Sequence, residues 1–162
     1  MADTNEAAAQ NNPGPQFSLQ RIYLKDLSFE SPRSPLVFQG AWKPQINLEL
    51  NSKHNKLEGD LYEVVLNLTI TAKNDGDEVA FLVELQQAGI FLIKGMEDAA
   101  LHQALGSFCP NLLFPYAREA IDNVVGKGSF PVLMLAPVNF DAIYAESLRQ
   151  RAEMEKNKKS TH

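Results

Sequence analysis

The decisive stretch of this 162-residue chain is residues 59–72, with the sequence GDLYEVVLNLTITA. Apolar side chains alternate there with mainly polar ones over ten residues, and the apolar set is Tyr62, Val64, Leu66, Leu68 and Ile70. A period of two is typical of a β-strand that buries one face and solvates the other. We therefore expect a long strand here, and the segments on either side decide what it pairs with.

Three further strands are predicted around this one. Asn74-Asp75-Gly76-Asp77 supplies turn residues that tolerate positive φ, so residues 79–87 should return as the second strand of a hairpin. Upstream, apolar and polar residues alternate over 46–50, before a polar turn at 51–56, and residues 17–30 form a longer β-branched and aromatic run. The sequence thus predicts a four-stranded, mainly antiparallel sheet.

The downstream part of the chain has the apolar period of helices. One helical stripe covers residues 99–108 and resumes over residues 117–125, while Pro110 and Pro115 should break or kink the helix between them. A last helix is expected to begin after Asn139, which is a favourable N-cap residue. A four-stranded sheet followed by two helices makes an α+β domain.

The two ends of the chain are expected to be disordered. Residues 1–16 and 156–162 lack apolar periodicity, which leaves residues 17–155 as the folded domain. No apolar run reaches the ~18 residues of a membrane span, and residues 1–16 carry no Lys or Arg, unlike the start of a signal peptide. We therefore expect a cytoplasmic protein without direct membrane insertion.

Charge is distributed unevenly along the chain. The formal net charge is -5, but residues 149–162 carry a net charge of +3 and residues 1–148 a net charge of -8. Nucleic-acid binding depends on neutralising phosphates, so an acidic body argues against it. This charge pattern favours a partner that presents a basic surface.

Candidate catalytic groups do not combine into a site. Cys109 and His102 have no orienting carboxylate at an evident spacing, and a buried Cys that acts as a small hydrophobe is the simpler interpretation. The other histidines, His54 and His162, are scattered, and Gly126-Lys127-Gly128-Ser129 lacks the spacing of a phosphate loop. We therefore predict a protein that is not an enzyme and that needs no metal or other cofactor.

Four long strings in order resemble the SecB family of bacterial export chaperones. They are YEVVL at 62–66, FLVELQQAGIF at 81–91, FCPNLLFPYARE at 108–119 and APVNFDA at 136–142, and the resemblance runs from about residue 17 to about residue 148. It implies an ATP-independent holdase that keeps precursor proteins unfolded and delivers them to the translocation motor SecA. It also implies a homotetramer, built as a dimer of dimers.

The acidic strand face matches the docking surface for SecA in this family. Carboxylates and one leucine fall on the polar side of the first and fourth predicted strands, and the matching residues are Asp26, Glu30, Leu82 and Glu84. A solvated strand face is the simpler interpretation of such carboxylates. Relatives often end in an acidic tail, whereas this chain ends with Lys158-Lys159 before its last residues, which puts a contact between the tail and SecA in doubt.

Hydrophobic residues in irregular segments form a second candidate site. Loops normally avoid such side chains, and we expect an unfolded-polypeptide groove lined by Phe38, Trp42, Phe130, Leu133, Leu135 and Phe140. An alternative is a small-molecule carrier whose hydrophobic pocket surrounds Trp42.

Assembly is expected on the opposite side of the fourth strand. Two modest helices cover only one sheet face and leave apolar surface over, for which association is the usual outcome. The residues predicted to support packing and the oligomer interface are Phe81, Val83, Leu85 and Gln87.

Overall fold

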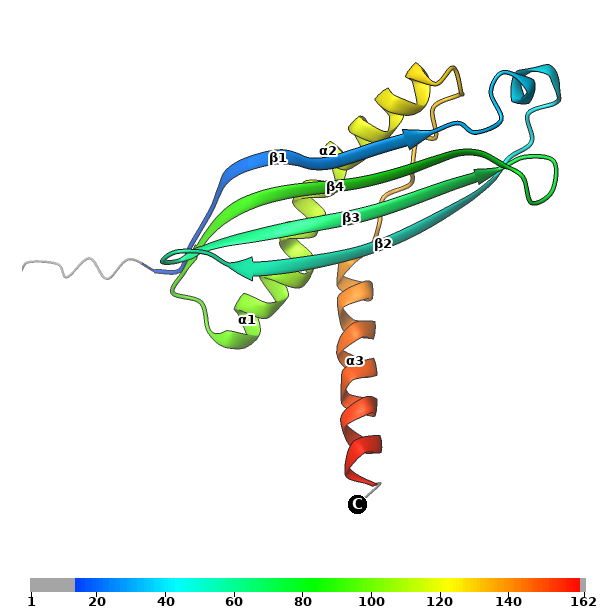
Figure 1. Ribbon diagram of the computed structural model, residues 1–162. Helices are drawn as coiled ribbons and strands as arrows, with labels where there is room; N and C mark the ends of the chain where they lie inside the picture. Colours follow the sequence, from blue (N-terminus) through cyan, green and yellow to red (C-terminus); the bar gives the residue numbers. More distant parts are fainter. Residues whose placement is uncertain (1–13, 161–162) are drawn as a thin grey trace, which may run out of the picture.

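A four-stranded antiparallel sheet organises the computed structural model, which describes residues 14–160 (Figure 1). Its strands are β1 (Gln16–Glu30), β2 (Gln45–Lys56), β3 (Leu61–Lys73) and β4 (Val79–Lys94). The order across the sheet is β1-β4-β3-β2, and every neighbouring pair is antiparallel. The predicted sheet and the predicted β3–β4 hairpin are therefore confirmed.

Burial alternates along β3 as the sequence predicts, because even-numbered residues face the core. The core forms against α2 (Cys109–Lys127), which crosses behind the sheet in the view of Figure 1. The buried stripe of α2 repeats every four residues and consists of Leu113, Ala117, Ile121 and Val125, all 0% exposed. One face of the sheet is thus covered by helix, and the other is left without a helical layer.

The expected break at Pro110 does not occur. α1 (Asp98–Gln103), a π-helical segment η2 (Ala104–Phe108) and α2 follow one another without an intervening loop. Pro110 lies in the first turn of α2, immediately after the wider π turn, where the missing proline N–H is accommodated. Pro115 is also helical, inside α2. The prolines therefore reshape the helix and do not end it.

α3 (Phe140–Lys159) begins where the sequence predicts. The Asn139 side chain accepts a hydrogen bond from the Ala142 backbone N–H at 3.0 Å, which is the expected N-cap. The first turns of α3 contact η2, where the Ser107 hydroxyl donates to the Asp141 carboxylate. Beyond them α3 extends away from the sheet (Figure 1).

Two boundaries differ from the sequence expectations. Residues 51–56, expected as a turn, continue β2, because Lys56 pairs with Tyr62 and the long strand β3 offers backbone partners along its whole length. Residues 156–159, expected to be disordered, form the last turn of α3. Most of the N-terminal segment 1–16 lies outside the described residues, and β1 begins at its last residue, Gln16.

Candidate functional site

The four residues predicted as an acidic docking surface lie together on the uncovered face of the sheet. In the β1–β4 register Asp26 is opposite Gln86, Ser28 is opposite Glu84 and Glu30 is opposite Leu82. Residues directly opposite each other in adjacent strands project from the same face. Asp26, Glu30 and Glu84 are exposed and Leu82 is half-buried, so a partly accessible leucine lies beside Glu30 and Glu84.

β2 adds a fifth member that sequence reasoning missed. Thr69 is opposite Glu84 on one side and Glu49 on the other, which places Glu49 on the same face and in the same cross-strand row as Glu84. Glu49 is exposed. The alternation over residues 46–50 was a signal for this position, but only the register identifies the strand that lies beside it. We call Asp26, Glu30, Glu49, Leu82 and Glu84 the acidic face.

An aromatic cluster centred on Phe130 lies at one end of the molecule. The ring centroid of Phe130 is 5.0 Å from that of Phe81 and 5.3 Å from those of Phe38 and Trp42, and Phe29 follows at 6.4 Å. These rings come from β1, β4, the loop before β2, the linker after α2 and the 3-10 helix η1 (Leu36–Gln39). Three predicted groove residues thus meet, joined by Phe29 and Phe81, which sequence reasoning did not place there.

Buried polar groups hold the irregular segments of this cluster. Asn74 is 3% exposed, accepts from the Lys43 N–H at 3.0 Å and donates to the Ala41 carbonyl at 3.1 Å, which fixes the loop that carries Trp42. In the linker, the Asp122 carboxylate accepts from the backbone N–H groups of Leu133 and Met134. The loops are therefore held by hydrogen bonds of the scaffold, as a preformed binding surface requires.

Exposure divides the aromatic cluster into two kinds of residue. Phe130 is 5% exposed and packs among the other rings, whereas Phe38 is 48% exposed. Trp42 lies between, with its ring centroid 6.3 Å from that of Phe81. Aromatic side chains fill the space beside Trp42, which does not favour the small-molecule carrier with an open pocket at this residue.

The remaining predicted groove residues lie along the linker and at its far end. Leu133 and Leu135 are half-buried and pack against the core. Phe140 is 5% exposed, and its ring is 5.9 Å from that of Phe114. The six residues therefore do not form one continuous cluster.

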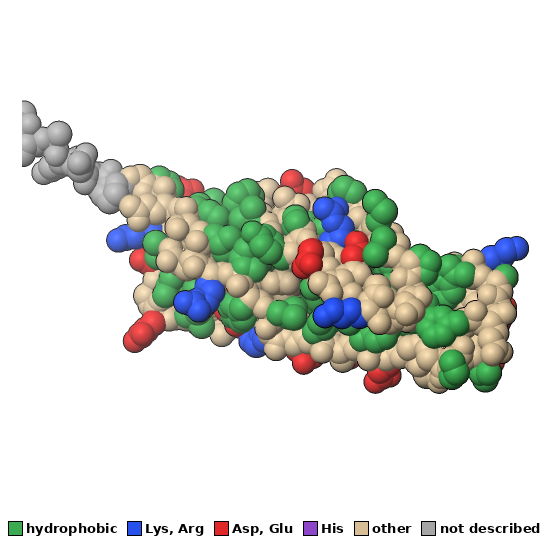
Figure 2. Space-filling view, turned by 90° about the horizontal axis from the view of Figure 1, so that it is seen from above, with side chains coloured by type: hydrophobic (Ala, Val, Ile, Leu, Met, Phe, Trp, Pro, Cys, Tyr) green, Lys and Arg blue, Asp and Glu red, His purple; other side chains and the backbone are tan. Residues whose placement is uncertain are grey.

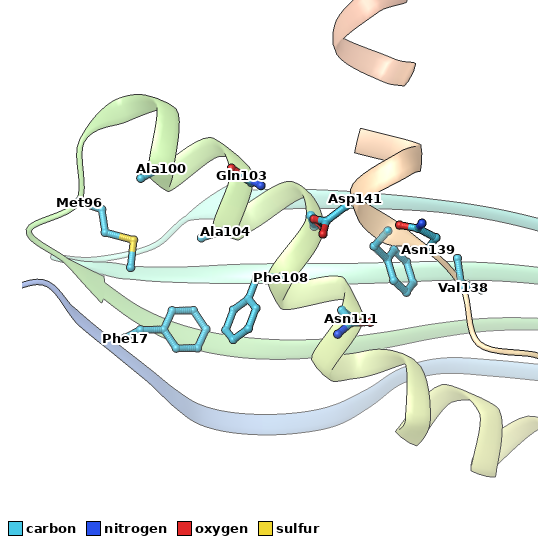
Figure 3. Close-up of a pocket in the computed structure, with 12 residues that line it drawn as sticks. Phe17, Met96, Ala100, Gln103, Ala104, Phe108, Asn111, Val138, Asn139 and Asp141 are labelled. Carbon is cyan, nitrogen blue, oxygen red and sulfur yellow. The ribbon is translucent and has the colours of Figure 1, made fainter. Parts of the chain in front are cut away.

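A groove of about 640 Å³ is lined in part by Phe140 and lies between the start of β1, the continuous helix of α1, η2 and α2, and the start of α3 (Figure 3). The Phe17 ring is 5.0 Å from that of Phe108, and Phe108 is 50% exposed. Asn111, Asn139 and Asp141 add polar groups, as Figure 3 shows. Sequence reasoning missed this groove, although an exposed Phe at the start of residues 108–119 was its signal.

The residues predicted for the oligomer interface are buried within the chain. Phe81 and Val83 are 0% exposed, Leu85 is 2% exposed and Gln87 is 4% exposed. The Gln87 side chain donates to the Tyr23 carbonyl at 3.1 Å. Their interface role stays a prediction, and it has to operate through the packing of α2 because these side chains are inaccessible to another chain.

The surroundings of Cys109 and His54 shift the pKa of each side chain. Cys109 is 0% exposed, and burial raises the pKa of its thiol to about 12, so the thiol is protonated at neutral pH. The rings of His54 and His102 are 6.5 Å apart, and burial, followed by the charges of His102 and Arg151, lowers the pKa of His54. Between residues 14 and 160, no helix is long and apolar enough to cross a bilayer.

Comparisons with known proteins agree with the resemblance in the sequence. Residues 10–151 match the family described as SecB, preprotein translocase subunit SecB. The protein-export protein SecB of Pseudomonas syringae pv. syringae is 64% identical over 149 residues, which cover 92% of this chain and 91% of that one. SecB of Marinobacter nauticus is 63% identical over 154 residues, with 94% and 93% covered.

A solved structure shares the fold. It is that of a SecB-like chaperone from Mycobacterium tuberculosis in complex with a ChAD peptide from an antitoxin. The TM-score is 0.63 and the sequence identity is 18%, with 75% of this chain and 90% of that one covered.

Proposed function

The chain belongs to the SecB family of protein-export chaperones, and on this premise we propose that it is an ATP-independent holdase that delivers unfolded precursors to SecA in the cytoplasm. The observation that carries the proposal is the half-exposed Phe38, which rests on a cluster of buried aromatic rings beside hydrogen-bonded loops. Apolar patches that stay exposed on a folded chain mark interaction sites, and Leu36, 63% exposed, extends the exposed apolar surface of Phe38 in η1.

Capture works by burial of apolar side chains of the precursor. An unfolded chain presents such side chains in extended segments, and these are the groups that Phe38 and the groove beside Phe108 accept. Because a holdase binds the unfolded state and not the folded state, its concentration and affinity set how far the folding equilibrium of the precursor shifts. Nucleotide hydrolysis has no part in this linkage.

Delivery uses the acidic face on the other side of the sheet. Its four carboxylates attract a basic segment of SecA, and Leu82 offers an apolar contact beside Glu30 and Glu84. Docking of SecA there leaves the aromatic cluster accessible, so a bound precursor is held while the motor approaches.

A homotetramer built as a dimer of dimers is supported by apolar surface along β1 and along the continuous helix formed by α1, η2 and α2. Figure 2 shows hydrophobic side chains gathered in several groups on the side viewed there. Leu19 and Leu24 lie opposite core residues of β4, yet they are 38% and 46% exposed. Phe108 and Tyr116 are 50% and 53% exposed. Association of copies is the usual outcome of such surface.

Light-scattering mass measurement without nucleotide tests the holdase. A tetramer that gains the mass of one urea-diluted, reduced client chain and ignores the folded client supports the proposal. A monomer that is indifferent to unfolded chains contradicts it.

A triple variant tests delivery. D26N/E30Q/E84Q should lose SecA binding and keep client binding, because it removes charge from the uncovered face only. The matched control E58Q/D60N/E97Q removes the same charge from exposed positions in turns and should bind SecA normally. Equal loss of SecA binding in both variants would show that net charge, and not this face, governs docking.

A further inference from the structure

On the uncovered face of the sheet, a run of carboxylate rows is followed by a region that contains lysines. Cross-strand rows on this face are two residues apart along each strand, or roughly 6.8 Å. Three successive rows contain the carboxylates of Glu30, of Glu84 with Glu49, and of Asp26. The next row contains Lys53, which is opposite Val65. Along β2 itself, Glu49 and Lys53 project from this face four residues apart, so the sign of the charge changes over two row spacings.

A hollow of about 320 Å³ marks this change of sign. It is lined by Lys25, Lys53, Asn55, Glu63, Asn67 and Gln86. Lys25 reaches it from a bulge in β1 between Leu24 and Asp26. The three amide side chains each carry N–H donors, so the hollow combines two ammonium groups with neutral donors.

The Glu63 carboxylate is already paired with neighbouring side chains, so it does not strongly repel an incoming anion. The Lys25 ammonium lies 3.0 and 3.1 Å from its two carboxylate oxygens, and the Tyr23 hydroxyl donates to it. Lys53 differs, because it is exposed and no hydrogen bond or ion pair with another residue of the described chain engages its ammonium group. One lysine thus neutralises Glu63, and the other is free to bind a carboxylate.

We propose that the hollow around Lys53 is a subsite for an acidic side chain of the protein segment that docks on the acidic face. The docking segment is then dipolar, with basic residues over the carboxylate rows and one Glu or Asp at the end of this run. This inference rests on the proposed docking function and adds the charge order of the partner. Charge complementarity across adjacent rows is the argument for it.

The row spacing fixes the sequence pattern of an extended partner. Side chains on one face of an extended peptide are also two residues apart, at the same spacing as the rows. An extended partner over the central strands β4 and β3 lies between Glu30 and Asp26 on β1 and Glu49 and Lys53 on β2. Three basic residues at alternate positions then fit the three acidic rows, and an acidic residue two positions further falls in the row of Lys53. A partner with the pattern K-x-K-x-K-x-E, in either chain direction, matches the face.

Three end-blocked synthetic peptides test the subsite by isothermal titration calorimetry. The sequences are K-T-K-T-K-T-E, its isomer K-T-E-T-K-T-K, in which the acidic residue faces a carboxylate row, and the neutral reference K-T-K-T-K-T-Q. The titrations are made near 10 mM ionic strength, where the screening length is about 30 Å. We expect the first peptide to bind roughly three- to tenfold more tightly than its isomer, because an attraction replaces a repulsion.

Variants of the full chain locate the effect. Lys53→Gln should remove the advantage of the first peptide over the neutral reference and reduce its advantage over the isomer, whose acidic residue still faces a carboxylate row. Lys127→Gln, at an exposed lysine at the end of α2, should preserve both advantages. An advantage over the neutral reference that survives Lys53→Gln overturns the proposal. So does equal binding of all three peptides to the unchanged chain.

The same titrations separate this inference from the docking function. If the three peptides bind equally and lose affinity with D26N/E30Q/E84Q, the acidic face docks basic segments and only the subsite is wrong. If none of the peptides binds and SecA does not bind either, both proposals fail. If millimolar acetate cancels the advantage without competing with the neutral peptide, the subsite takes carboxylates, as proposed.

Discussion

Replacement of Phe38 by serine should weaken client binding while the fold is kept. Phe38 is 48% exposed in η1, and its ring contacts the buried Phe130 at a centroid distance of 5.3 Å. The exposed part is the surface that an unfolded client covers. The buried part contributes to the cluster, and loss of one aromatic pair of this kind costs about 1 kcal/mol of stability. The chain should therefore fold normally and bind less tightly.

The exposed area of Phe38 sets the size of the effect. An aromatic side chain buries about 150–250 Å² in a protein, so the exposed 48% corresponds to roughly 100 Å². At about 25 cal/mol per Å², complete burial by a client contributes ~2.5 kcal/mol, or roughly 60-fold in affinity. Ordering of the client offsets part of this gain, so we expect a five- to 60-fold increase in Kd, with the upper value as a limit.

Fluorescence titration with a reduced, permanently unfolded client measures this increase. Met154→Ser is the matched control, because Met154 is 64% exposed and lies near the end of α3, away from the aromatic cluster. Thermal unfolding of each variant reports stability separately. An unchanged Kd for Phe38→Ser, or the same increase for both variants, would refute the assignment of the client site to the aromatic cluster.

Three further predictions concern the fold. Hydrogen bonds from Tyr23 and then from Lys25 lower the pKa of Glu63. The stability advantage of the unchanged chain over Glu63→Gln should therefore be complete above about pH 4.5 and shrink as the pH falls through the lowered pKa. Urea unfolding measures this advantage, and growth of the advantage with acidity would contradict the prediction. Cys109 should resist alkylation at pH 8 and react after unfolding, since burial raises its pKa to about 12, and rapid labelling of the native chain would contradict this. Gly106→Ala should speed hydrogen exchange in α3, because the new Cβ would lie 2.6 Å from the Tyr144 ring, whereas Gly126→Ala, with no neighbour within 4 Å, should not.

The local structure that the sequence predicts well is encoded by short-range chemistry. Strict alternation around Leu66 specifies a strand because a period of two leaves one face apolar. The hairpin turn and the Asn139 cap depend on side chains within a few residues of the backbone that they serve. The SecB resemblance predicted Asp26 and Glu84 on one docking face; in the β1–β4 register they lie on the same face of the sheet, in adjacent cross-strand rows, and their docking role stays a prediction.

What the sequence could not supply depends on register and on packing between distant segments. Glu49 and Lys53 lie on the same uncovered face as Glu84 only because β2 pairs with β3 in one particular register. Pro110 is expected from sequence to break or kink the helix. The π-helical turn that precedes it in the structure explains why the helix continues. The strand face alone assigns Phe81 to the predicted oligomer interface. The sequence does not reveal that the linker after α2 brings the Phe130 ring into contact with Phe81.

The two proposed binding surfaces share the same strands, and this arrangement predicts how they communicate. Leu82 and Glu84 project from one face of β4, while Phe81 and Val83 project from the other into the core. The strands pair in one register along their length, and a ligand on one face biases the other only through an element with a second arrangement. We therefore expect SecA docking to leave client affinity unchanged, within about twofold, so that delivery depends on proximity and competition. Client titration with and without saturating SecA measures this coupling. A larger change in Kd would require a moving element between the faces, and linkage would then demand an equal effect of client on peptide affinity.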